Sequence, residues 1–501
     1  MAGALEDANK PTAPRSLTDA ICIQIGQGPN STPQSLTDAI CIQIGQGPNS
    51  TPQSLTDAIR TQINQGPNFT QSLKCISSAR IYRVPEDLRN LKQSAYAPRF
   101  VSVGPLHSHD QHLKNSSLNM TKINCVTSLI YRAVKSREEA KKLLKQCLTK
   151  MEECINEAKK YYPQEEAAAA LNEEMLLVDG CLILELLYRH YDIVQKKTKG
   201  NELLDLGIDS ALTYHTVQRD LLLLENQLPF FVLLELFRLT GAKAAAASSV
   251  TLVDYVLTFF CDLLNLQIIP DKAKEDGDTF HILHLLQKHY LPVDLPQPKT
   301  RCQFIQSATD LDYAGVKFES HKADLKFEPN KAISPFQVKF EDPSGLKRWW
   351  FSRASFKIPT LHINDSTELF LRNLIAFEQC CPFIDSYVTS YAFVMDRLIN
   401  TAKDVDVLQK AGIICNYLGS HKDASDLFNK LCSEVAIEHF YFADTCEQAA
   451  EYSSRFWPHA VAHLRRNNFS TPWAYIAFCV AFILFFSSLV AAIRNLREMT
   501  K

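Results

Sequence analysis

Hydrophobic and polar positions follow a helical period along most of this chain. Apolar side chains recur every three or four residues, which is the pattern of helices with one buried face. We expect such helices at residues 121–162 (one helix, or two with a break), 166–190, 213–227, 230–239, 250–266, 279–290, 366–380, 386–401, 404–415, 422–432 and 437–466. The pattern therefore predicts a mainly α, multi-helical body.

The period changes between residues 315 and 358. Four short segments there alternate between apolar and polar positions and contain many aromatic residues, which is typical of strands. They are residues 316–319, 325–327, 336–340 and 349–358. The alternation predicts a small sheet of about three to five strands, inserted into the helical body.

The longest apolar run is residues 473–493, which contain 21 positions without a charge. A helix of that length spans about 30 Å, the hydrocarbon thickness of a bilayer. Trp473 and Tyr475 suit one membrane interface, and Arg494 and Arg497 suit the other. A buried core helix is the alternative, but core helices are seldom apolar on every face for so long. We therefore predict one C-terminal transmembrane helix that serves as a membrane anchor.

A tandem repeat opens the chain. The 19-residue unit SLTDAICIQIGQGPNSTPQ occupies residues 16–34, recurs unchanged at 35–53, and has a diverged third copy at 54–71. Copies this similar indicate a recent duplication, and we expect them to be flexible. The predicted organisation is a repeat region at 1–71, a helical body at 72–466 with its sheet at about 315–358, a transmembrane helix at 473–493 and a short basic tail at 494–501.

Composition narrows the possible functions. The chain is 46% hydrophobic and 22% charged, with a net charge of −2. This balance argues against nucleic acid as the main partner, because no basic excess is available for phosphates. Its 15 cysteines are irregularly spaced and form no pair of C-x-x-C motifs. We expect reduced, mostly buried thiols and no metal site.

The first candidate site lies in the apolar stretch DLLLLENQLPFFVLLEL at residues 220–236. Glu225, Asn226 and Gln227 interrupt it, and buried polar groups need partners. They form either a structural hydrogen-bond network or part of a functional site.

A second candidate lies in IPTLHINDSTELFLRNLIAFEQC at residues 358–380. Asp365 and Glu368 have the spacing of a helix cap and its box partner, and Glu368 can also pair with a later arginine in the helix. Asn373 and Glu378 lie close to the buried stripe. They too are expected either to belong to a structural network or to be site residues.

Evidence for catalysis is weak in this sequence. Glu225 is not accompanied by a second carboxylate or a nucleophile at a diagnostic spacing, and no phosphate-binding or nucleophile-elbow motif is present in the sequence. The histidines of HSHDQH at residues 107–112 could supply metal ligands, but a solvated loop is the simpler interpretation. We predict no enzymatic activity, no catalytic, cofactor-binding or metal-binding residues, and no cofactor.

Eight stretches in order make the chain resemble the plant domain of unknown function 247 family. They are IYRVPEDLR (81–89), AYAPRFVSVGPLH (95–107), MLLVDGCLILELL (175–187), DLLLLENQLPFFVL (220–233), SATDLDYAGVKF (307–318), IPTLHINDSTELFLRNLIAFEQ (358–379), VTSYAFVMDRLINTAKDVDVLQKAGII (388–414) and the C-terminal apolar helix. The resemblance implies a mainly helical, single-pass membrane protein of plants with no established catalytic residues. Some members are linked to pollen–stigma recognition in grasses, which makes recognition the leading function class by analogy.

These observations predict a membrane-tethered interaction or recognition protein that contacts the lipid bilayer and an unknown protein partner. The alternative is an enzyme of unrecognised type that uses Glu225 or Glu378. We expect the plasma membrane as its location. We also expect a cytosolic body, because few residues follow the apolar helix and no N-terminal signal precedes the body.

Overall fold

The computed structural model divides the chain into two compact units, Met1–Ser77 and Ser78–Lys501. The structure describes residues 79–114, 116–195, 208, 210–245, 250–265, 278–292, 294–300, 305–320, 334–342, 353–455 and 472–499. The predicted repeat region at 1–71 lies outside these residues. The description below therefore concerns the second unit.

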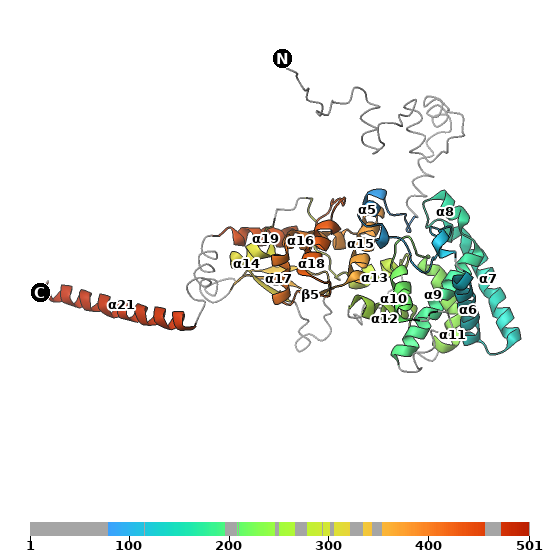
Figure 1. Ribbon diagram of the computed structural model, residues 1–501, viewed down its shortest axis with the longest axis horizontal. Coiled ribbons are helices and arrows are strands. Elements are labelled where there is room, and N and C mark those ends of the chain that lie inside the picture. The colour runs from blue at the N-terminus through green and yellow to red at the C-terminus, as the bar shows by residue number, and fades with distance from the viewer. Residues whose placement is uncertain are drawn as a thin grey trace, which may run out of the picture. The chain divides into compact units, whose positions relative to one another are not determined.

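The first half of this unit is a helical bundle built around α9 (Figure 1). Its helices are α5 (Glu86–Leu91), α6 (Ser116–Ala133), α7 (Arg137–Lys159), α8 (Glu165–Ala170), α9 (Glu173–Val194), α10 (Ala211–Asp220), α11 (Phe230–Ala245), α12 (Leu252–Leu264) and α13 (Ile282–Tyr290). Helix α9 contacts α6, α7, α11 and α12. Nearly every side chain of α9 from Leu176 to His190 is buried, because neighbours cover it on all sides. Two short 3-10 helices, η1 (Gln93–Ala95) and η2 (Gln111–Leu113), lie in the segment before α6.

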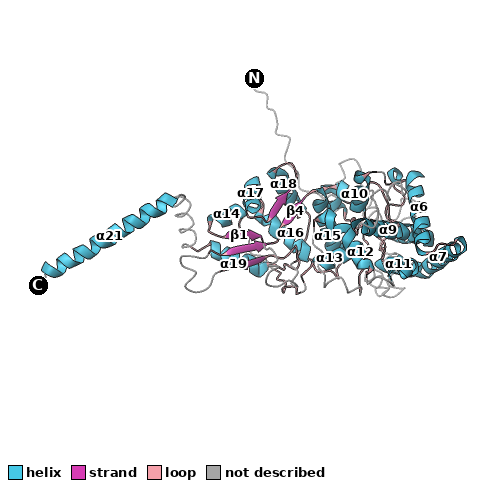
Figure 2. Cartoon of the chain, turned by 90° about the horizontal axis from the view of Figure 1, so that it is seen from below, coloured by secondary structure: helices cyan, strands magenta, loops and turns pink. Residues whose placement is uncertain are grey.

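The second half combines shorter helices with the strands (Figure 2). Its helices are α14 (Ala308–Tyr313), α15 (Asp365–Cys380), α16 (Tyr387–Leu398), α17 (Ala402–Lys410), α18 (His421–Leu431) and α19 (Ala443–Ser453). Helix α15 joins the halves, because it contacts α12 and α13 on one side and α16 on the other. The mainly α fold predicted from the sequence is confirmed.

The predicted small sheet is present. It has three strands in the order β1 (Lys317–Ser320), β3 (Ser355–Ile358) and β2 (Lys339–Glu341), with β1 parallel and β2 antiparallel to β3. Phe318 and Phe340 both lie opposite Phe356, so three buried rings align across one face. Aromatic cross-strand pairs of this kind stabilise a sheet. The strand expected at 325–327 lies outside the described residues.

A second sheet was not anticipated. Strand β4 (Leu361–Ile363) pairs in parallel with β5 (Ile414–Asn416). The helix predicted at 404–415 was too long, because α17 ends at Lys410 and Gly412 takes a left-handed conformation with φ of 75°. The chain then turns and continues as a strand.

The helix predicted at 213–227 was also too long, since α10 ends at Asp220. The Asn226 amide donates to the Asp220 carbonyl at 2.9 Å, and the Gln227 amide donates to the carbonyls of Leu221 and Leu223 at 2.8 and 2.9 Å. These side chains take carbonyls that a continuing helix would use.

Other boundaries changed for local reasons. Helix α15 is capped by Asn364 rather than Asp365: its Oδ1 accepts the Thr367 N–H at 2.9 Å in a capping box with Thr367. Residues 121–162 form two helices, α6 and α7, and 166–190 falls in α8 and α9, the second capped by Asn172. Within 437–466, the only helix among the described residues is α19.

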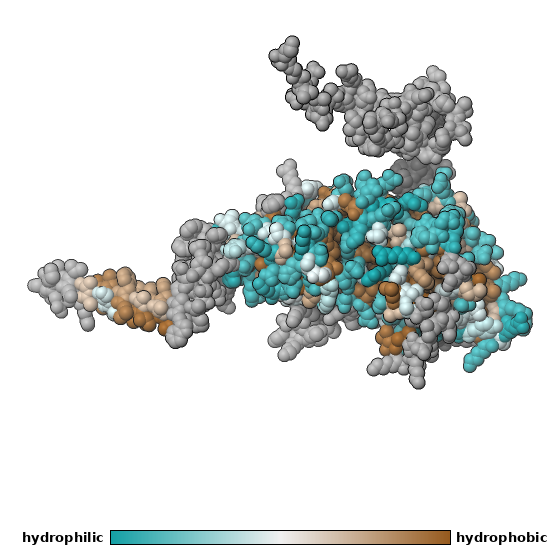
Figure 3. Space-filling view, in the orientation of Figure 1, coloured by the Kyte–Doolittle hydropathy of each residue, from teal (hydrophilic) through white to brown (hydrophobic). Residues whose placement is uncertain are grey.

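The C-terminal helix α21 (Pro472–Met499) contrasts with the body (Figure 3). Its segment Ile476–Ile493 has a mean hydropathy of 2.7, and none of it is buried within the structure. By length and composition it can cross a membrane. It includes Trp473, Tyr475, Arg494 and Arg497, whose side chains lie outside the described part of the structure.

Candidate functional site

Residues 81–107, which we call the N-terminal strap, contain α5 and η1 but are otherwise irregular, and they lie against the turn between α10 and α11. Irregular backbone that is buried must find hydrogen-bond partners outside itself. Asp220 provides three of them: its carboxylate accepts the N–H groups of Arg99, Phe100 and Val101 at 2.9, 2.7 and 2.9 Å. Burial raises the pKa of Asp220 to about 6, while the three N–H donors limit the rise.

Asn226 and Gln227 continue this arrangement. The Asn226 Oδ1 accepts the Val103 N–H at 2.7 Å, and its amide donates to the Val101 carbonyl at 3.0 Å. The Gln227 Oε1 accepts the N–H of Leu283 in α13 at 3.3 Å. Both side chains are buried, so they join the strap, the turn and α13 in the protein interior.

Glu225 anchors the beginning of the strap. Its Oε1 accepts the Val84 N–H at 2.6 Å and also pairs with Arg89. Its Oε2 lies 3.1 Å from His107 Nε2, which is within ion-pair distance, but the two atoms form no hydrogen bond. His107 Nδ1 lies 2.8 Å from Asp110. The buried His107 thus lies between two carboxylates instead of in a solvated loop, which corrects the prediction for that residue.

Asn373 connects the same turn to α15. Its Oδ1 accepts the Leu224 N–H at 2.9 Å, and its amide donates to the carbonyls of Ala95 and Leu369, both at 2.8 Å. The structure therefore brings Glu225, Asn226, Gln227 and Asn373 together where the strap passes over the turn between α10 and α11. We call this place the strap crossing.

Glu378 lies apart from that crossing, at the far end of α15. Its carboxylate accepts the N–H groups of Val388 and Thr389 at 3.0 and 2.7 Å, the Thr389 hydroxyl at 2.6 Å and the Gln287 amide at 2.6 Å. It therefore holds the start of α16 and links α15 to α13. Burial raises the pKa of Glu378 to about 7, and its four donors oppose that rise.

Two aspartates of this network were not singled out from the sequence. Asp220 begins the DLLLLENQ stretch, and Asp179 in α9 accepts the Gly104 N–H at 2.9 Å and pairs with Lys122 at 2.6 Å. Gly104 has φ of 70°, and a Cβ there would lie 2.9 Å from the Gln227 carbonyl oxygen. A lone acidic residue in an apolar helix, as in LLVDGCLIL, is the signal that would have pointed to Asp179.

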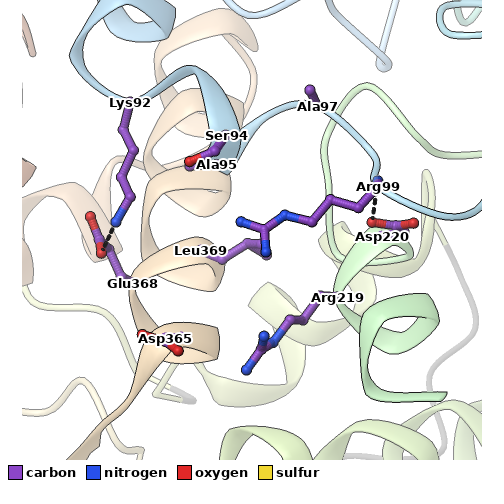
Figure 4. A pocket seen from close by; sticks show the side chains of 10 residues that line it. All are labelled: Lys92, Ser94, Ala95, Ala97, Arg99, Arg219, Asp220, Asp365, Glu368 and Leu369. Carbon is purple, nitrogen blue, oxygen red and sulfur yellow. Dashed lines mark hydrogen bonds and ion pairs between the residues drawn. The ribbon is translucent and has the colours of Figure 1, made fainter. Parts of the chain in front are cut away.

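A cleft of about 220 Å³ opens beside the strap, between the end of α10 and the first turn of α15 (Figure 4). Six charged residues line it: Lys92, Arg99, Arg219, Asp220, Asp365 and Glu368. Figure 4 shows the Arg99 and Arg219 side chains extending into it toward α15. The lining does not include Glu225 or Glu378.

Several of these charges already have partners. Glu368 pairs with Lys92 and, as the sequence predicted, with Arg372, whose Nε lies at 2.9 Å. Burial opposes ionisation of Glu368, but the hydrogen bonds from Lys92 and Arg372 outweigh burial and lower the pKa of its carboxyl. Asp220 is occupied by the strap. Arg99, Arg219 and Asp365 have no ion-pair partner among the described residues.

Metal chemistry has no evident centre in the described part of the chain, which contains no group of three or more metal-ligating side chains. His112, for example, places its Nε2 3.0 Å from the Pro98 carbonyl. Ten cysteines in that part are free thiols.

The fold and the polar network first define a class of protein. It has a mainly helical body in which buried polar residues hold the N-terminal strap, and the exposed apolar helix α21 follows that body. Residues 81–487 match the family described as plant protein of unknown function, DUF247, and the chain belongs to that family. The predicted resemblance is thereby confirmed.

Two proteins of Arabidopsis thaliana are similar to this chain. The UPF0481 protein At3g47200 is 24% identical over 433 residues, which are 83% of this chain and 86% of that protein. The putative UPF0481 protein At3g02645 is 26% identical over 165 residues, 33% of this chain and 30% of that protein. No solved structure matches the chain.

Proposed function

We propose that this protein is a membrane-tethered interaction module whose body presents a recognition surface to a protein partner. The observation that carries the proposal is α21, whose segment Ile476–Ile493 is strongly apolar and unburied. Sixteen of its eighteen residues are apolar and the other two are serines, and such a segment without a protein environment is most stable in lipid.

The polar residues of the body support interaction over catalysis. Glu225 and Glu378 are the carboxylates on which an enzyme would depend, yet each receives donors from backbone and side chains that hold the fold together. A carboxylate occupied in this way is poorly placed to exchange a proton with a substrate.

An exposed apolar stripe on α6 is a candidate for the partner surface. Met120, Ile123 and Tyr131 are 57%, 54% and 48% exposed and recur at helical spacing. Apolar side chains that gather on a surface often mark a protein interface.

The anchor is tested by deleting residues 473–501 from the full chain. The truncated protein should enter the soluble fraction, whereas the intact protein should resist alkaline carbonate extraction. A folded truncated protein that still resists extraction would refute α21 as the anchor.

The interaction surface is tested by proximity labelling in intact plant cells. Replacing Met120, Ile123 and Tyr131 by serine should remove a subset of labelled proteins. A matched triple serine variant at exposed Leu212, Tyr313 and Tyr417 should leave that subset unchanged. Identical labelling by the wild type and the α6 variant would refute the stripe as the partner surface.

For orientation, we propose a cytosolic body at the plasma membrane. The acceptor sequences that begin at Asn119 and Asn364 should then remain without glycans. A glycosidase-induced change in mobility on a gel would place the body outside the cytosol.

A further inference from the structure

Two guanidinium groups, those of Arg99 and Arg219, enter the cleft beside the strap and form no ion pair with a carboxylate of the described residues. Arg219 donates through Nε to the Ser366 hydroxyl at 2.9 Å, which orients its side chain across the cleft and leaves its terminal nitrogens available. Arg99 is exposed, while its backbone is held by Asp220. Figure 4 shows both side chains extending toward the first turn of α15. Their positions are set by buried contacts, and their charged ends face open space.

The remaining charges of the cleft form no ion pair with Arg99 or Arg219 in the described structure, although the nearby Arg99 charge helps to limit the rise in the pKa of Asp220. Glu368 is engaged by Lys92 and Arg372, and Asp220 accepts three strap N–H groups. Asp365 is exposed and is the one carboxylate of the lining without a partner in the described structure. The cleft thus presents two guanidinium groups and one carboxylate that form no ion pair with the described residues.

A pair of guanidinium groups in a small cleft is suited to bind an oxyanion. The planar donors of arginine match the oxygen spacing of phosphate, and charge-assisted hydrogen bonds of this type are among the strongest in proteins. Two arginines balance a doubly charged phosphate better than a singly charged carboxylate. Asp365 would repel a bare anion but would accept a hydroxyl group. The volume of about 220 Å³ is below that of pockets for drug-sized ligands, roughly 300–1,000 Å³.

We propose that this cleft binds the phosphate group of a small hydroxylated phosphomonoester, with Arg99 and Arg219 as the phosphate ligands and Asp365 as the acceptor for a ligand hydroxyl. Such a ligand site goes beyond membrane anchoring and partner recognition, and it does not depend on either.

The first experiment measures thermal unfolding of the full-length, detergent-solubilised protein during titration with glycerol 3-phosphate, inorganic phosphate or sodium chloride at matched ionic strength. Glycerol 3-phosphate should raise the melting temperature saturably, at lower concentration than inorganic phosphate, and chloride should have no such effect. Equal responses to phosphate and chloride would overturn the site. Equal affinity for the two phosphates would overturn the contact with Asp365.

Variants then locate the binding. Arg99→Gln and Arg219→Gln should each weaken glycerol 3-phosphate binding at least tenfold, because each removes a charge-assisted contact. Arg238→Gln is the matched control, since Arg238 is an exposed arginine of α11 that pairs with Glu235 away from the cleft. Arg99 has no side-chain bond to the described fold, so its variant decides the matter if Arg219→Gln does not fold. Wild-type affinity in folded Arg99→Gln would refute the proposal.

Discussion

The strap crossing and the cleft are built from the same short segments, but their polar groups differ. Those at the crossing have hydrogen-bond partners within the fold, whereas several in the cleft do not form an ion pair with the described residues. At the crossing, the buried groups of Asp220, Asn226 and Asn373 are paired with named partners. Beside it, Arg219, the residue before Asp220, and Arg99, whose N–H donates to Asp220, extend their charged ends into an open cleft. Buried polar groups must be satisfied by the fold itself, whereas groups in a cleft can leave that role to solvent or to a ligand. Substitutions at the crossing should therefore lower stability, and those in the cleft should affect binding.

The largest effect is expected from Asp220→Leu. It leaves three N–H groups of the strap without an acceptor: the buried one of Val101 costs about 1–3 kcal/mol, and the partly buried ones of Arg99 and Phe100 cost less. The free energy of unfolding, measured by urea denaturation of the full-length protein in detergent, should fall by roughly 3 kcal/mol or more. Asp365→Asn in the cleft is the control and should change it by less than about 0.5 kcal/mol. Equal, small effects at both positions would remove the contrast between the two regions.

Glu378→Leu should destabilise the protein by roughly 2 kcal/mol. Two of its four donors, the Thr389 hydroxyl and the Gln287 amide, can rotate toward other partners, while the N–H groups at the start of α16 cannot. Binding of glycerol 3-phosphate to the folded variant should be unchanged, because Glu378 lies outside the cleft lining. A stable variant that has lost a biochemical activity would instead support the enzyme hypothesis.

Stability should depend on pH through Glu378. Its pKa is about 7 in the folded protein against 4.5 for the ordinary side chain, so between these values the folded state binds more protons than the unfolded state. Stability contributed by this group is then fully present below pH 4.5 and is lost as pH rises toward 7, by at most about 1.4 kcal/mol per pH unit. Glu378→Gln should flatten the curve of unfolding free energy between pH 5 and 7. An unchanged slope in that variant would show that Glu378 does not titrate there.

The smallest effect is expected from Lys92→Ala. Lys92 pairs with Glu368 at the rim of the cleft with its side chain 43% exposed, and Glu368 keeps Arg372 as a partner. Ion pairs at the surface contribute little, so unfolding free energy should fall by less than about 0.5 kcal/mol. A decrease in unfolding free energy comparable to that of Glu378→Leu would show that the rim of the cleft also contributes substantially to stability.

The sequence pattern predicted those helices and strands whose formation depends mainly on consecutive residues. The apolar positions of 230–239 and 422–432 have a clear helical period; α11 contains the first range, and α18 contains the second except Cys432, which caps it. The strand at β3 was recognisable because Ser355–Ile358 alternates, although its place between β1 and β2 was not. The requirement that Glu225, Asn226 and Gln227 find partners followed from their apolar surroundings, but the identity of those partners did not.

The sequence by itself determined the class of protein and the nature of its C-terminal helix, because helical periodicity and an unbroken apolar run are properties of consecutive residues. Only the tertiary structure decided that α10 ends at Asp220 and that the end of the helix predicted at 404–415 is instead strand β5, paired with β4. It also placed Arg99 and Arg219 in the lining of one cleft. These outcomes depend on contacts between residues far apart in the chain. Asp220 and the strap it holds are separated by about 120 positions. Such contacts form when elements pack, and no local pattern encodes which distant backbone group will meet which side chain.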